Sequence, residues 1–98
     1  GGRGVLIDKN TVITAIHNES LALPERKNGY ISVFSLDERS EDVTISGLKY
    51  NIDKSQLTST FPVGVSNEFV GKKAFISVKN GTLLIIWKEN IKKYLTEL

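Results

Sequence analysis

The chain has 98 residues, a formal net charge of +2, and 40% hydrophobic against 24% charged residues, values typical of a folded globular domain. This length suffices for one hydrophobic core, so we expect a single β-rich domain over residues 1–98. The absence of cysteine excludes disulfides, thiolate zinc sites and a cysteine nucleophile. No apolar run approaches the length of a membrane span, and the net charge is too small to indicate nucleic acid by itself. A chain that lacks methionine and starts at Gly1 suggests a processed product or an excised domain.

The first third of the chain predicts β-strands. Residues 4–7 and 11–17 are β-branched runs on either side of a turn-forming Asp-Lys-Asn, which indicates a hairpin. A polar loop is expected over residues 18–29, and strand character resumes at residues 30–36.

The middle of the chain alternates charged turns with short apolar runs. Residues 37–42 form a charged turn into a strand at 43–45, and Gly47 suggests a bulge before a strand at 48–52. Residues 53–68 are rich in Ser, Thr, Asn and Gly, which favours a long surface loop.

The last third predicts a second hairpin and a helix. Asn80-Gly81 lies between the apolar runs 74–78 and 83–87, a strong hairpin signal. Because residues 83–87 are all apolar, this strand should be covered on both faces and central. Apolar residues then recur with helical spacing over 91–98, which predicts a short amphipathic C-terminal helix.

The first hairpin carries a specific pattern that ends at the only histidine. Its members are Gly4, Leu6, Ile7, Val12, Ile13, Thr14, Ala15 and His17. The pattern resembles the hairpin that delivers the catalytic histidine in chymotrypsin-like serine proteases, with departures at Ile16 and Asn18. The resemblance covers mainly residues 4–52. It implies that His17 is a general base, whose role requires an orienting carboxylate and a nearby serine hydroxyl.

The rest of such a triad is less complete. Asp42, which precedes a strand as the family's aspartate does, is the first candidate for the carboxylate, with Asp53 as the second. Ser66 is the nearest match to the nucleophile, although a turn residue would look the same. Asn67 follows it where the family has the glycine that shapes the oxyanion hole. We therefore expect a domain that is incomplete or inactive by itself.

A second pattern covers residues 43–94 and includes Val70-Gly71-Lys72-Lys73 between two predicted strands. It resembles the small β-barrel that follows the catalytic core of Mu-type transposases. The resemblance implies DNA contacts, for which Lys72, Lys73 and Lys79 are the candidates because lysines neutralise phosphates. Lysines that protect an exposed strand edge would give the same pattern.

From the sequence we expect a mainly β domain, a small barrel or sandwich of about six strands with a short C-terminal helix. The leading hypothesis is a hydrolase-like domain related to serine proteases, with a polypeptide substrate or protein partner. A DNA-binding module and a noncatalytic protein-interaction domain are the alternatives. The residues indicate no cofactor, metal or membrane, and they leave the oligomeric state and cellular location open.

Overall fold

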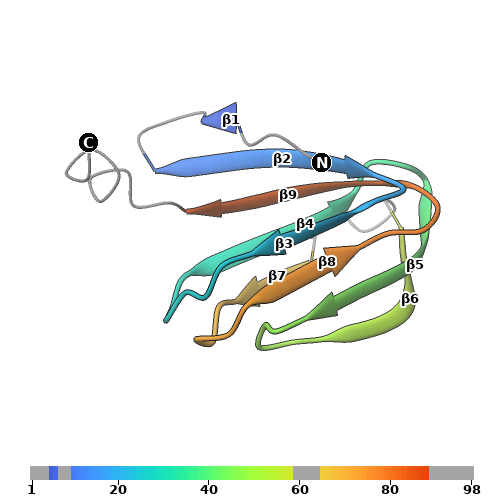
Figure 1. The fold of residues 1–98 in the computed structure, drawn as a ribbon. Helices are drawn as coiled ribbons and strands as arrows, with labels where there is room; N and C mark the ends of the chain where they lie inside the picture. The colour runs from blue at the N-terminus through green and yellow to red at the C-terminus, as the bar shows by residue number, and fades with distance from the viewer. Residues whose placement is uncertain (1–4, 7–9, 59–64, 89–98) are drawn as a thin grey trace.

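The computed structural model describes residues 5–6, 10–58 and 65–88, which form a sandwich of two antiparallel sheets (Figure 1). The five-stranded sheet has the order β1-β2-β9-β4-β7, and the four-stranded sheet has the order β3-β8-β5-β6. The strands are β1 (Val5–Leu6), β2 (Thr11–His17), β3 (Ser20–Leu23), β4 (Tyr30–Ser35), β5 (Arg39–Ser46), β6 (Ile52–Thr58), β7 (Val65–Glu68), β8 (Ala74–Ser77) and β9 (Thr82–Lys88).

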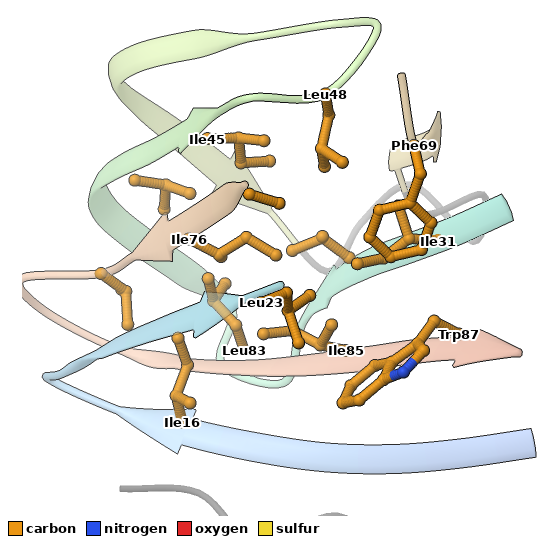
Figure 2. Packing of buried hydrophobic residues seen from close by; sticks show 14 of the residues in the cluster. Ile16, Leu23, Ile31, Ile45, Leu48, Phe69, Ile76, Leu83, Ile85 and Trp87 are labelled. Atoms are coloured by element: carbon orange, nitrogen blue, oxygen red, sulfur yellow. The ribbon is translucent and has the colours of Figure 1, made fainter. Parts of the chain in front are cut away.

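The core lies between the two sheets, where alternate residues of β4, β8 and β9 are buried (Figure 2). In β9, Leu83, Ile85 and Trp87 are buried, and the two residues between them are only half-buried. β9 is therefore central in its sheet, as expected, but it is fully covered on one face only. The four-stranded sheet supplies the opposite wall of the core, with Ile45 and Ile76 fully buried.

The Asn80-Gly81 segment does not close a hairpin, because β8 and β9 belong to different sheets. It forms a corner instead. The backbones of Asn80 and Glu41 are hydrogen-bonded to each other, and the amide of Gly81 donates to Asn18 Oδ1. A Cβ at Gly81 would lie 2.5 Å from Ser40 Oγ. The Asn-Gly pair thus permits a close crossing between the sheets, which its sequence alone does not distinguish from a hairpin turn.

Three strands lie where the sequence predicts loops. β3 falls in the expected loop 18–29, and β6 and β7 fall in the expected loop 53–68. All three are edge strands. Edge strands bury fewer side chains, so their sequences show weaker apolar alternation.

The expectation of a mainly β domain is confirmed, and of the two architectures the structure has the sandwich. The described residues form nine strands in place of about six. The first hairpin forms as expected, with Val5 opposite Ile13. Of residues 48–52, expected as a strand, 48–51 lie between β5 and β6, and Ile52 begins β6. The predicted helix at 91–98 lies outside the described residues, and the described part of the chain contains no helix that could cross a membrane.

Candidate functional site

Three loops meet at one end of the sandwich, which we call the tyrosine end: residues 24–29, 47–51 and 69–73 (Figure 1). The amide of Phe69 donates to the carbonyl of Gly29 at 2.9 Å, and that of Gly71 donates to the carbonyl of Arg26 at 2.7 Å. The Arg26 guanidinium also lies 5.1 Å from the centre of the Phe69 ring. These contacts tie the 24–29 loop to the 69–73 loop.

A close backbone approach fixes the position of the 47–51 loop. A Cβ at Gly47 would lie 2.0 Å from the carbonyl oxygen of Lys73, and the φ of Gly47 is +77°. Both observations require glycine. The next residue, Leu48, is buried and pairs with Phe69 in an isolated bridge. The loop that carries Tyr50 is therefore anchored at its start.

Asn67 of β7 holds the Tyr50 backbone from the other side. Its side chain, which is 1% exposed, accepts from the Tyr50 amide at 2.9 Å and donates to the Tyr50 carbonyl at 2.6 Å. The side-chain oxygen of Asn67 also accepts from the Glu68 amide at 3.0 Å. One buried amide side chain thus satisfies three backbone groups. The backbone of Tyr50 is therefore held in place, while the residue is 56% exposed to solvent.

Charged groups surround this ring. The Lys49 ammonium lies 3.0 Å from Glu68 Oε2 and 5.4 Å from the centre of the Tyr50 ring. The hydrogen bond and negative charge of Glu68 raise the pKa of Lys49 above its ordinary value of 10.5, so Lys49 is cationic at neutral pH. Tyr30, the cross-strand neighbour of Glu68, adds a second exposed aromatic residue. The tyrosine end therefore combines exposed aromatic rings with a carboxylate that already holds a cation.

The opposite end, which we call the corner end, has an open hollow of about 770 Å³. Its lining is polar: His17, Asn18, Asp37, Glu38, Arg39, Glu41, Gln56, Thr58, Asn80 and Gly81. Several of these groups are already bonded to the protein. Asp37 Oδ2 accepts from the Thr82 amide at 2.7 Å, and Arg39 pairs with Glu41 at 3.4 Å. Among the described residues, no group of three or more His, Asp and Glu could hold a metal ion.

The structure does not assemble the expected triad. His17 Nδ1 is hydrogen-bonded to Thr82 Oγ1 at 2.8 Å, where a protease would have its carboxylate. Asp42 is exposed in the irregular part of β5, with a φ of 52°. The backbone of Ser66 is in β7, and β9 and β4 separate β7 from the His17 strand. Three strand spacings place these strands about 14 Å apart. Ser66 is also on the register of Ile13, four residues from His17.

The lysines expected to bind DNA do not form one patch. Lys72 and Lys73 are exposed in the loop before β8, whereas Lys79 follows β8 near the corner end. Five residues lie between Lys73 and Lys79, so in extended backbone the two are six residue steps apart, or about 20 Å.

The model of the family described as thiamin pyrophosphokinase, vitamin B1 binding domain matches residues 16–83. The chain belongs to this family. The match runs from the last two residues of β2 to the first two residues of β9, and so includes both ends of the sandwich. No curated protein matches the chain significantly.

Solved structures with a similar fold include several thiamin pyrophosphokinases. That of Geobacillus thermodenitrificans has a TM-score of 0.76 and 20% identity, with 85% of this chain and 39% of that chain covered. That of Bacillus subtilis has a TM-score of 0.73 and 25% identity, with 86% and 40% covered. The yeast enzyme has a TM-score of 0.68 and 16% identity, with 92% and 31% covered. The chain thus spans about two fifths of the bacterial enzymes or less.

Membership of the vitamin B1 binding family overturns the functions expected from sequence. The relationship to serine proteases is wrong, and so are the transposase-type DNA-binding module and the generic interaction domain. The protease pattern was a shared hairpin shape. Its strands are formed by the same β-branched residues and turn chemistry that many β domains use.

Sequence reasoning missed the residues that matter most at the tyrosine end. Tyr50 was placed inside a strand, and Asn67 was considered only as a substitute for a protease glycine. One signal was present: Tyr50 lies between the turn-forming residues Gly47 and Asn51, where an aromatic residue is expected to be exposed. Nothing local in the sequence indicates that Asn67 bonds to a loop 17 residues away.

Proposed function

We propose that this chain is the thiamin-binding β-sandwich of a thiamin pyrophosphokinase. The observation that supports the proposal is the family match over residues 16–83. The bacterial relatives are more than twice as long as the matched part, so we assign binding of the vitamin to this domain. The groups that transfer the pyrophosphoryl unit would come from the part of the relatives that this chain does not cover.

Within the domain, we assign the vitamin to the tyrosine end. Thiamin consists of a positively charged thiazolium ring joined to an aminopyrimidine ring. A flat cation is attracted to the face of a tyrosine ring and to a carboxylate. Tyr50 and Glu68 supply both on backbones that Asn67 fixes, so little further ordering is needed when the ligand binds.

Calorimetric titration of the full-length protein with thiamin tests this assignment. Tyr50→Ala should weaken binding by about tenfold, the loss of one aromatic stacking contact. Tyr50→Trp should retain binding because it keeps an aromatic face. Leu36→Ala is the matched control: Leu36 is equally exposed, but it lies beside the corner end.

Two results would contradict the proposal in different ways. If the unchanged protein fails to bind thiamin at millimolar concentration, the function is wrong. If it binds and Tyr50→Ala does so equally well, the vitamin belongs elsewhere on the domain.

A further inference from the structure

We infer that Lys49 is an internal competitor for the ligand cation: its ammonium occupies the site formed by the Tyr50 ring and the Glu68 carboxylate, and a bound thiazolium must displace it. This inference rests on the proposed function. It adds a residue that sets the affinity of the site and its preference for charged ligands.

The geometry shows that the site holds a cation when no ligand is present. Lys49 Nζ is in hydrogen-bond distance of Glu68 Oε2 at 3.0 Å and stands over the Tyr50 ring at 5.4 Å. Hydrogen bonds fix the backbone of Lys49 beside that of Glu68. The Lys49 amide donates to the Glu68 carbonyl at 3.0 Å, and the Asn67 side chain accepts from the amides of Tyr50 and Glu68. The fold thus fixes the backbone that carries the ammonium beside the backbone that carries Glu68.

Two cations cannot share this site without repulsion. At about 4 Å, two unit charges repel measurably even with the dielectric constant of water. The Lys49 side chain is half exposed on a flexible four-carbon stem, so it can swing into solvent when another cation arrives. A thiazolium can then pair with Glu68 in its place. A neutral ring of the same shape cannot, and it gains nothing from the carboxylate.

The inference predicts an unusual result, namely that removing a residue of the site strengthens binding. In Lys49→Met, which keeps the aliphatic stem, thiamin should bind about fivefold more tightly. Deazathiamin, in which carbon replaces the charged ring nitrogen, should change by less than about twofold, because it does not compete for Glu68. The matched control Lys79→Met makes the same charge change at the other end of the sandwich and should leave both affinities unchanged.

Salt dependence provides a readout that a purely structural role would not alter. In the unchanged protein the Lys49 and Glu68 charges cancel, so thiamin binding should depend weakly on ionic strength. In Lys49→Met the uncompensated carboxylate should make the affinity fall clearly between 0.05 and about 0.5 M salt, as screening increases. The variant should fold normally, because Lys49 is exposed.

The titration separates failure of this inference from failure of the proposed function. Thiamin binding by the unchanged protein, with equal or weaker binding by Lys49→Met, overturns the competitor role alone. An equal gain for thiamin and deazathiamin also overturns it, since the gain would then be steric. Absence of thiamin binding in both proteins overturns the proposed function and the competitor role together. Binding by Lys49→Met alone supports both.

Discussion

The two ends of the sandwich use their polar groups in opposite ways. At the corner end the buried hydroxyls of Ser35 and Ser40 bond to each other at 2.6 Å, and charged side chains line an open hollow. At the tyrosine end the buried polar group, Asn67, bonds only to backbone and leaves aromatic rings exposed. At the corner end the buried polar groups join the two sheets, because Ser35 is in β4 and Ser40 is in β5. At the tyrosine end, Asn67 holds the backbone of an exposed aromatic residue in place, and an exposed aromatic face suits a flat ligand.

The largest expected effect tests how closely the loops of the tyrosine end are packed. Gly47→Ala would place a Cβ against the Lys73 carbonyl at a positive φ, and should destabilise the fold by about 4 kcal/mol. Gly71→Ala is the control, since its φ is also positive but its Cβ would meet nothing within 4 Å. It should cost about 1 kcal/mol. Equal losses in urea denaturation would contradict the close approach.

The Asn67 contacts should give the next largest loss. Asn67→Ala leaves two amides and one carbonyl without their partner, so we expect a loss of about 3 kcal/mol in unfolding free energy. Asn51→Ala, in the same loop, removes a single, partly buried bond to the Leu48 amide and should cost about 1 kcal/mol or less. A reversed order would show that Asn67 is not the main support of Tyr50.

At the corner end the buried hydroxyl pair should give a smaller, coupled effect. Ser40→Ala should cost about 1 kcal/mol, because Ser35 can still donate to the Asp37 carbonyl at 2.8 Å. Ser35→Ala and the double variant complete a cycle. Since the two residues share one bond, the double variant should lose less than the sum of the single losses. If the losses of the two single variants add up to that of the double variant, the bond between Ser35 and Ser40 does not contribute to stability.

The smallest effect is expected at His17. Its bond to Thr82 is exposed, so His17→Ala should change stability by less than about 0.5 kcal/mol. Thiamin affinity, measured by titration, should stay the same, because His17 lies at the end opposite Tyr50. A clear loss of affinity would move the ligand site toward the hollow.

What the sequence predicts well is the part of the fold that its local patterns determine. The first hairpin follows from β-branched runs, and the central position of β9 follows from its apolar run at 83–87. The edge strands β3, β6 and β7 were missed because they bury little. The change of chain direction at Asn80-Gly81 was predicted correctly, but the pairing of β8 with β9 was wrong. Nothing within a few residues of this pair specifies which sheet the next strand joins.

The candidate site was much less predictable than the fold. His17 drew attention because it is the only histidine and ends a familiar hairpin, yet its neighbours in space are Thr82 and a polar corner. Tyr50, Asn67 and Lys49 depend on contacts between loops far apart in the sequence. Each residue alone is ordinary, and only the packing of β7 against the β5–β6 turn gives them a joint role.

The pairing of β2 with β9 has a consequence for biosynthesis. The whole length of β2, from Thr11 to His17, lies against residues Lys88 to Thr82. The ribosome makes the chain from the N-terminus, so more than sixty further residues must be synthesised after β2 before its main partner, β9, is present. Pairing over such a sequence separation is slow, and the waiting strand offers unpaired backbone to other chains. Yield in the cell is thus expected to depend on how well the nascent chain is shielded until Lys88 has left the exit tunnel.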